Sequence, residues 1–163
     1  MVAKEAGLSR GPQQYHFPTR VDLMIGVWDF ATNRVVASYG ETFAKVHSIT
    51  ERIELIIDGH IELAASEGHV AELELRMATR GDAELKEALR DRIDQRATKV
   101  DQQWVDLLAE TRIPREDLIA RRYTLMSLVN GLAIMRLSGR PAHFLARMED
   151  ELRSTMRHLL SSV

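Results

Sequence analysis

The segment PREDLIARRYTLMSLVNGLAIMRLSG, residues 114–139, decides the fold class. Pro114 suits the first turn of a helix and Gly139 suits its end, while Glu116 and Asp117 stand near the positive end of the helix dipole. Apolar side chains occur on nearly every face of this predicted helix, so it must be covered on every side. Only four Pro and nine Gly occur in 163 residues, and most stand where helices start or stop. The sequence therefore predicts an all-α protein.

The segments that flank residues 114–139 also have helical periodicity. On the N-terminal side, one apolar stripe recurs at spacings of three and four: Leu85, Leu89, Ile93, Ala97, Val100, Trp104 and Leu107 or Leu108. On the C-terminal side, a last helix carries the apolar residues Phe144, Met148, Leu152, Met156 and Leu159 or Leu160. Two long C-terminal helices with this much apolar surface predict a homodimer, in which they form a four-helix bundle with a second copy. The alternative is that all of this surface is the core of a monomer.

Three signals predict where the preceding helices begin. Ser48-Ile-Thr-Glu51 has the spacing of a capping box and predicts a helix that follows it. Glu67-Gly-His69 predicts a stop and a restart, with a short helix over 70–79. Asp82, directly after Gly81, predicts the N-cap of the long helix that carries the apolar stripe.

Composition limits the classes of function. The 22 basic and 24 acidic residues give a net charge of −2, so any DNA contact would be confined to a small face. The first twenty residues are the candidate, with Lys4, Arg10 and Arg20 against Glu5. The absence of Cys excludes thiolate zinc sites and iron–sulfur clusters. No apolar run reaches the length of a membrane helix and no secretory leader is present, so we expect a cytoplasmic protein with no membrane partner.

The segment EAGLSRGPQQYHFPTRVDL, residues 5–23, carries the clearest functional signal. Gly7 suits a tight turn, Ser9 suits the N-cap of a short helix, and Thr19-Arg-Val-Asp22 has the spacing that opens a further helix. A helix, a Gly-containing turn and a short helix form a helix-turn-helix. Arg and Gln can form bidentate hydrogen bonds with base edges, and Tyr, Thr and Arg commonly bind phosphates. A short Gln-rich helix on the surface is the alternative interpretation.

This segment resembles the second half of the DNA-binding domain of the TetR family of transcriptional regulators. The matching positions follow in order without a gap: Glu5-Ala-Gly7, Leu8-Ser9, Gly11, Gln14, His16-Phe17, Thr19, Arg20 and Leu23. Pro12 and Gln13 depart from the family's pattern. The resemblance implies a recognition helix over 9–16, a core position for Phe17, and DNA contacts by Arg10, Gln13, Gln14, Tyr15, His16, Thr19 and Arg20.

The resemblance also implies a domain organisation. Residues 1–36 would be a partial helix-turn-helix region with a connecting helix, and residues 37–163 a helical domain for effector binding and dimerisation. In the family a further helix precedes the position of Val2, so we expect a truncated chain, a start codon placed too far downstream, or a remnant that no longer binds DNA. Operator DNA would then be a partner when that helix is restored, and the first twenty residues are expected to be loosely held.

Regulators of this family generally hold a small effector inside the larger domain. The residues that the sequence offers for this site are Trp28, Ile57, His60, Ile61, Met77, Trp104, Tyr123, Met126 and Asn130. Trp, Met and Tyr would give an adaptable apolar lining, and His60 and Asn130 would orient the ligand. We therefore expect a mainly apolar effector of moderate size. The alternative for each single residue is ordinary core packing.

Other kinds of site have weaker support. His60 and His69 lack partners at the spacings that build metal sites on helices, so no metal and no cofactor are expected. Glu72 and Glu74 are expected to be solvated, and no phosphate loop or nucleophile elbow occurs, so no enzyme activity is expected. The sequence as a whole predicts a ligand-responsive repressor of transcription. The alternative function is a helical small-molecule-binding homodimer that does not bind DNA in this form.

Overall fold

The structure is a computed structural model that describes residues 17–43, 46 and 48–161, except for the side chains of residues 33–42. The described residues form helices and no strands, which confirms the all-α prediction. The helices are α3 (Arg20–Phe43), α4 (Ile49–Ala65), α5 (Glu67–Ala78), α6 (Ala83–Leu107), the short 3₁₀ helix η1 (Ala109–Thr111), α7 (Arg115–Leu137) and α8 (Ala142–Ser161). Helix α3 passes through the predicted domain boundary at residue 36 without a break. That boundary itself stays a prediction.

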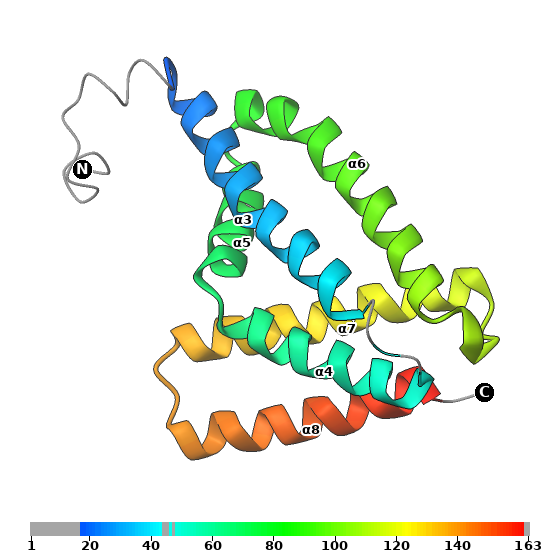
Figure 1. Ribbon diagram of the computed structural model, residues 1–163. Coiled ribbons are helices and arrows are strands. Elements are labelled where there is room, and N and C mark those ends of the chain that lie inside the picture. The colour runs from blue at the N-terminus through cyan, green and yellow to red at the C-terminus, as the bar shows by residue number, and fades with distance from the viewer. Residues whose placement is uncertain (1–16, 44–45, 47, 162–163) are drawn as a thin grey trace.

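The helices are arranged as a base and two long arms (Figure 1). Helices α4, α7 and α8 pack against one another and form the base. Helices α3 and α6 rise from this base as the two arms, and α5 lies beside α3. The last turns of α6 return to the start of α7, so α6 joins the far end of α3 to the base.

Most of the buried apolar side chains form one cluster in the base, which we call the large core. Ile56 and Ile57 of α4, Leu125 and Val129 of α7, and Met156 of α8 are fully buried in it. Trp104 near the end of α6 joins the same cluster and is held in place by its indole N–H, which donates to the carbonyl oxygen of Leu118 at 2.9 Å. Phe43 at the end of α3 belongs to the same cluster, so the large core ties five helices together.

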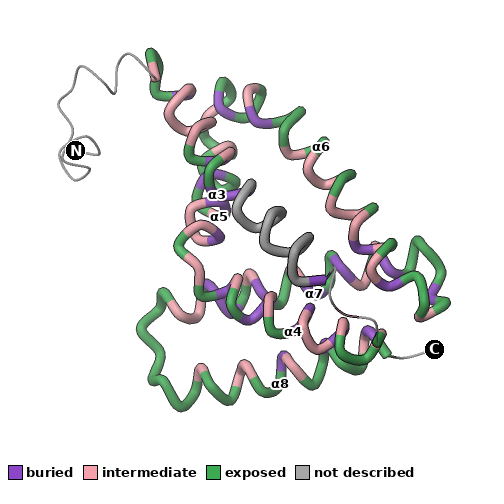
Figure 2. The backbone as a smooth tube through the Cα atoms, viewed as in Figure 1, coloured by how far each residue is buried: buried purple, intermediate pink, exposed green. Residues whose placement is uncertain are grey.

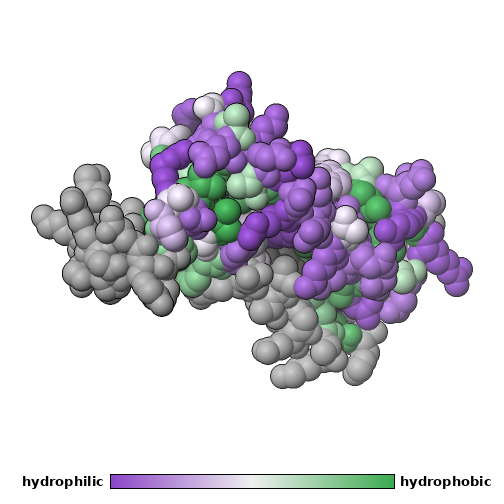
Figure 3. Space-filling model, turned by 90° about the horizontal axis from the view of Figure 1, so that it is seen from above, coloured by the Kyte–Doolittle hydropathy of each residue, from purple (hydrophilic) through white to green (hydrophobic). Residues whose placement is uncertain are grey.

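A second cluster, the small core, lies between the two arms and α5. It consists of Val21 and Trp28 of α3, Leu75 of α5, and Leu85 and Leu89 of α6. Figure 2 shows the two groups of buried residues at the two ends of α6, with a less buried stretch between them. The face in Figure 3 is mostly hydrophilic, and its hydrophobic side chains gather in separate patches.

The predicted starts of α4 and α6 are correct in position, but the start of α5 and the capping of α4 differ from the prediction. Ser48 is the N-cap of α4, but its side chain makes no capping hydrogen bond, so the predicted capping box is not formed. The restart after α4 occurs at Ser66 instead of at Gly68, because the Ser66 hydroxyl accepts the backbone N–H of His69 and starts α5 at Glu67. Asp82 caps α6 as predicted by accepting the backbone N–H of Leu85 at 3.0 Å.

Helix α7 has the extent that the sequence predicts, and the chain itself covers only part of its apolar surface. It starts one residue after Pro114, and Gly139, with a φ of 69°, follows its end as predicted. Only one face is covered within the chain. Four of its large apolar side chains are 40–65% exposed: Tyr123, Leu128, Ile134 and Leu137. The remaining apolar faces are the surface that the predicted second copy would cover, and that second copy stays a prediction.

Candidate ligand-binding pocket

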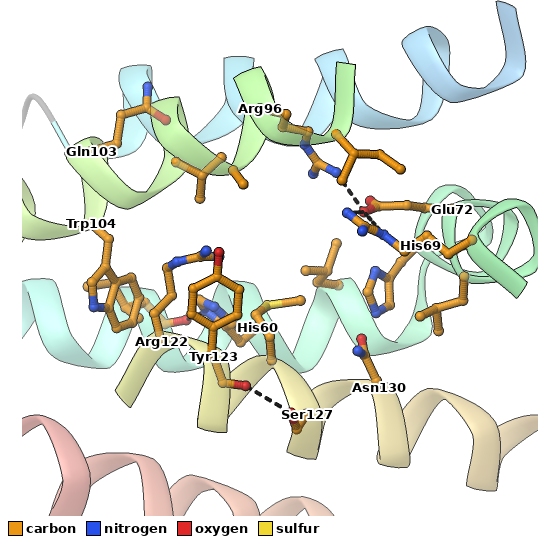
Figure 4. A pocket seen from close by; sticks show the side chains of 18 of the residues that line it. His60, His69, Glu72, Arg96, Gln103, Trp104, Arg122, Tyr123, Ser127 and Asn130 are labelled. Carbon is orange, nitrogen blue, oxygen red and sulfur yellow. Dashed lines mark hydrogen bonds and ion pairs between the residues drawn. The ribbon is translucent and has the colours of Figure 1, made fainter. Parts of the chain in front are cut away.

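A cavity of about 420 Å³ lies between the large core and the small core. Side chains of α4, α5, α6 and α7 line it, and Figure 4 shows them pointing into one space. The volume is within the range of small-molecule sites in proteins, which is about 300–1,000 Å³. The cavity has an apolar end near Trp104 and a charged end near Glu72 and Arg96.

The middle of α6 supplies one wall of the pocket. Leu85 and Leu89 are buried in the small core and Trp104 is buried in the large core, but Ile93, Ala97 and Val100 between them line the cavity. The predicted apolar stripe is thus one helix face with two functions. Its ends close the two cores, and its middle faces the pocket.

The apolar end of the pocket combines aliphatic and aromatic side chains. Trp104 lies at this end, and Ile56, Leu63 and Met126 are among the apolar residues of the lining. The ring of His60 lies edge to face against Trp104, with 5.8 Å between ring centroids and 73° between the planes. Its Nδ1 is 2.7 Å from the carbonyl oxygen of Ile56, and burial lowers the pKa of the ring below 6.5. His60 is therefore a neutral part of an apolar wall.

Arg122, a buried arginine of α7, lies beside the apolar end of the pocket. Nε of Arg122 donates to Oδ1 of Asp101 on α6 at 2.6 Å, and its guanidinium lies 4.3 Å from the centroid of the Tyr123 ring. The ion pair joins α6 to α7 across the pocket and neutralises the arginine. Because Arg122 has this partner, its charge is balanced within the chain.

The charged end is built around Glu72, which is only 8% exposed. Its Oε1 accepts from Nη1 of Arg96 at 2.7 Å and from Nη2 and Nε of Arg76 at 3.0 and 3.2 Å. Burial opposes ionisation of Glu72, but the two arginines outweigh it and hold the pKa of the carboxyl below its usual value. The expectation that Glu72 is solvated is wrong, because two basic partners from α5 and α6 allow it to be buried.

Arg76 and Arg96 also cover the tryptophan of the small core. The guanidinium carbons of Arg76 and Arg96 lie 5.0 and 5.9 Å from the centroid of the Trp28 ring, which is 1% exposed. Both distances suit cation–π interactions. Arg76 and Arg96 therefore both line the pocket and pack against Trp28 on α3.

Three polar atoms at the charged end lack a hydrogen bond of standard geometry with the described residues. They are Nε2 of His69, Nε of Arg96 and Oδ1 of Asn130. His69 is 3% exposed, and burial lowers the pKa of its ring. The negative charge of Glu72 and a side-chain hydrogen bond with Asn130 act to raise that pKa, but burial has the larger effect. Figure 4 shows His69 and Asn130 facing each other next to Glu72 and Arg96. A buried polar atom without a partner is costly, so this end is suited to a polar ligand group.

The structure brings together five of the nine residues that the sequence offers for a ligand. The residues that line the cavity are His60, Trp104, Tyr123, Met126 and Asn130. The other four lie elsewhere. Trp28 is in the small core, Ile57 and Ile61 are in the large core, and Met77 is 63% exposed on α5. Ile56 faces the pocket where Ile57 was expected, because neighbouring residues differ by about 100° around a helix.

The titratable and charged part of the lining was not predicted from the sequence: His69, Glu72, Arg76, Asp94, Arg96 and Arg122. One signal was present, since Glu72 and Arg76 have the i, i+4 spacing of an ion pair on one helix face. That signal does not reveal burial, because the same spacing is common on solvated faces. The partner on α6, Arg96, becomes visible only when the two helices are brought together.

The predicted DNA-binding residues are only partly covered by the structure. Residues 10, 13, 14, 15 and 16 lie outside the described residues. Thr19 and Asp22 form the predicted capping box of α3, with Thr19 N–H 3.0 Å from Oδ2 of Asp22 and Asp22 N–H 3.0 Å from Oγ1 of Thr19. Arg20, the first residue of α3, is exposed and pairs with Asp82, the N-cap of α6. The DNA contacts stay predictions.

Phe17 packs against α3 at Gly26. A Cβ atom on Gly26 would lie 2.5 Å from the Phe17 ring, so this close approach requires glycine. Phe17 is half-buried and belongs to neither core, so the core position that the resemblance implied for it is not found in the described residues.

Two further properties concern the described residues only. No group of three His, Asp or Glu side chains in residues 17–43, 46 and 48–161 is arranged to hold a metal ion. A membrane-spanning helix is not found in the same part of the chain, because none of its helices has the necessary length and apolarity.

Comparison with known proteins gives one informative similarity. No protein-family model matches the chain, and no solved structure is significantly similar to it. Over 136 residues the chain is 24% identical to the HTH-type transcriptional regulator CymR of Pseudomonas putida, and the alignment covers 83% of this chain and 67% of that protein. An alignment of this length extends well beyond the N-terminal motif into the helical base. It supports a role in the regulation of transcription.

Proposed function

We propose that this protein is a ligand-responsive transcriptional regulator of the TetR type, which binds DNA with its N-terminal residues and a small molecule in the pocket. The similarity to an HTH-type transcriptional regulator over most of the chain is the observation that carries the proposal. The helix-turn-helix resemblance over residues 5–23 and the cavity between α4, α5, α6 and α7 support its two parts.

Regulation would pass from the pocket to α3 through the charged end. Arg76 and Arg96 contact both Glu72 in the pocket and Trp28 on α3, and α3 leads directly to the DNA-binding segment. A ligand that moves these arginines would change how α3 packs. In a dimer, such a shift would change the separation of two DNA-binding segments relative to successive major grooves, and DNA would be released. We therefore propose a repressor that its ligand inactivates.

Homodimerisation is part of the proposal. The exposed apolar side chains of Leu128, Ile134 and Leu137 on α7 and Phe144 on α8 form the surface that a second copy would cover. Sedimentation equilibrium tests this directly. Ile134→Glu is expected to shift the protein toward the monomer, while Met77→Glu, on an equally exposed apolar residue of α5, leaves the dimer intact. A wild-type protein that sediments as a monomer would contradict the dimer.

DNA binding is tested by fluorescence anisotropy with a labelled duplex from the DNA upstream of the protein's own coding sequence. A scrambled duplex is the control, and a version of the chain extended in frame upstream is measured beside it. Specific affinity should fall steeply with salt, and Arg10→Ala or Gln14→Ala should reduce it by about tenfold or more. Equal affinity for the specific and scrambled duplexes in both versions would contradict the regulator.

A second candidate function is a helical small-molecule-binding dimer that does not bind DNA. It is favoured by one observation, since the pocket is built entirely from α4–α7 and needs no residue of the N-terminal segment. Ligand binding in the absence of any DNA binding would distinguish this function from the first. For both candidates we propose binding without catalysis. A general acid needs a raised pKa, whereas Arg96 and Arg76 hold the pKa of Glu72 low.

A further inference from the structure

The acidic and basic side chains at the charged end of the pocket balance one another. Glu72 and Arg96 are both largely buried, and they pair with each other at 2.7 Å. Arg76, which also pairs with Glu72, and Asp94 are both exposed, so water screens their charges, which have opposite signs. Each carboxylate at this end is therefore matched by one guanidinium group, both within the buried pair and within the exposed pair.

The other titratable groups of the lining add no net charge. Arg122 on α7 is neutralised by Asp101. Burial lowers the pKa of His60 and His69 below 6.5, so both rings are neutral at neutral pH. An ionic ligand group would lose its hydration in the cavity without gaining an uncompensated charge of opposite sign from the described lining. An uncharged ligand avoids this cost.

Asn130 on α7 supplies a hydrogen-bonding group for an uncharged ligand. The side chains of His69 and Asn130 are hydrogen-bonded to each other, and this bond acts to raise the pKa of the ring. A bond with that effect is one in which the imidazole donates and the amide oxygen accepts. The NH₂ group of Asn130 then remains for a ligand. Because this group donates, the ligand needs an acceptor oxygen, such as that of a ketone, an ester or an ether.

Apolar side chains dominate the rest of the lining. Ile93 and Val100 of α6 and Met126 of α7 are among them, and Figure 4 shows Trp104 at the opposite end of the pocket from Asn130. The cavity volume of about 420 Å³ exceeds what a single carbonyl group would fill. The ligand therefore carries an apolar body next to its acceptor oxygen.

We propose that the pocket binds an uncharged, mainly apolar compound, whose acceptor oxygen is hydrogen-bonded by the Asn130 NH₂ group and whose apolar body extends toward Trp104. This ligand class rests on the ligand-binding role proposed above. Anions and cations of the same shape are rejected. Either ion would have to stay without a partner or break the pair of Glu72 and Arg96.

Three compounds of one shape test the ligand class. Benzylacetone is an uncharged ketone. In hydrocinnamate a carboxylate oxygen replaces its methyl group, and in the matching amine an ammonium group replaces its oxygen. Each compound is titrated into the full chain by isothermal calorimetry. Benzylacetone should bind, and both ions should bind at least about tenfold more weakly. Equal or tighter binding of either ion, or no binding of benzylacetone, overturns the proposal.

Glu72→Gln and Arg96→Gln unbalance the pocket in opposite directions. Both remove one side of the same ion pair, so a purely structural effect would change the affinities for all three compounds alike. Glu72→Gln leaves a positive charge and should raise the affinity for hydrocinnamate relative to benzylacetone by about tenfold. Arg96→Gln leaves a negative charge and should do the same for the amine. An unchanged ratio in either variant overturns charge balance as the cause of the selectivity.

Asn130→Leu tests the hydrogen bond. The reference compound is isopentylbenzene, in which a methyl group replaces the ketone oxygen. The ratio of the affinity for benzylacetone to that for isopentylbenzene should fall by about threefold or more in Asn130→Leu. Ser127→Ala is the matched control on the same helix, because the Ser127 hydroxyl already donates to the carbonyl oxygen of Tyr123 at 2.9 Å, and it should leave the ratio unchanged. An equal ratio in wild type and Asn130→Leu overturns the assignment of Asn130.

The result also distinguishes this inference from the proposed function. If one of the ions binds best and changes the affinity for upstream DNA, the regulator stands and the uncharged ligand is wrong. If benzylacetone binds best and the protein has no specific affinity for DNA, the ligand class stands and the regulator is wrong.

Discussion

The large core and the small core differ in size and in how they are closed. The large core is closed by apolar side chains from five helices, among them the fully buried Ile57, Leu125 and Met156. The small core has five buried residues, and its tryptophan is covered by the guanidinium groups of Arg76 and Arg96. Charged groups that also line a pocket can rearrange at a lower cost than a close-packed apolar layer. The difference indicates that the large core holds the fold, and it agrees with the proposal that the small core changes its packing when a ligand binds.

The largest expected effect is in the large core. Leu125→Ala should reduce the free energy of unfolding by roughly 2–5 kcal/mol, because the side chain is fully buried and its neighbours cannot fill the cavity. Urea denaturation followed by circular dichroism measures this. Met77→Ala, at an exposed apolar residue, is the control and should stay within about 0.5 kcal/mol of wild type. Similar losses in both variants would contradict the assignment of the core.

A smaller and more local effect is expected in the small core. Leu89→Ala should cost about 2 kcal/mol, at the lower end of the range for buried leucine, because the small core can partly collapse onto the gap. The chain has two tryptophans, so in a Trp104→Phe background the fluorescence reports on Trp28 alone. The urea midpoint from Trp28 fluorescence should then fall more than the midpoint from circular dichroism. A common shift of both midpoints would show that the two cores unfold as one.

The pH dependence of stability should report on the two buried histidines that border the cores. Burial lowers the pKa of His60 and His69 below 6.5 in the folded protein. As the pH falls through 6.5, the unfolded chain takes up protons that the folded chain does not, so the free energy of unfolding decreases toward acid. The slope is at most about 1.4 kcal/mol per pH unit for each histidine. Urea titrations between neutral and mildly acidic pH should show a flatter slope in the double variant His60→Gln, His69→Gln than in wild type. An unchanged slope contradicts the burial of both rings.

The smallest expected effect is the loss of unfolding free energy when either of two serines that precede helices is replaced by alanine. Ser66→Ala should cost about 1 kcal/mol, because the hydroxyl caps α5 by accepting the His69 N–H. Ser48→Ala should leave the free energy of unfolding almost unchanged, since Ser48 makes no side-chain cap on α4. Thermal unfolding of both variants beside wild type measures the difference. Equal losses would mean that Ser48 also caps its helix.

Apolar periodicity, together with the Gly, Pro and capping residues that mark helix ends, predicted most of the helices. The apolar spacing located α6 and α7, and Asp82 and Gly139 marked real ends. The pocket was harder to predict. Periodicity identifies the face of α6 that points inward, but it does not distinguish Leu89, which meets a neighbour, from Val100, which meets a cavity.

The charged end of the pocket could not be predicted for a different reason. Glu72 resembles any glutamate on an amphipathic helix until Arg96, which comes from another helix, is placed beside it. The burial of a charge depends on such a long-range partner, and a single sequence carries no signal for it. Asn130 was predicted because it is a polar residue inside an apolar stretch, and Tyr123 because its ring suits an adaptable apolar lining, whereas arginines on α5 and α6 carry no such signal.

Hydrogen–deuterium exchange of the full chain, resolved to short peptides, tests the division into two cores most directly. The account predicts that amides of α5 and of the first turns of α6 exchange through local opening, well before the amides around Leu125 and Val129 of α7. The slow amides of α7 should exchange only through global unfolding, so their protection should fall with added urea as the global stability does. A single level of protection across α5, the start of α6 and α7 would contradict the account.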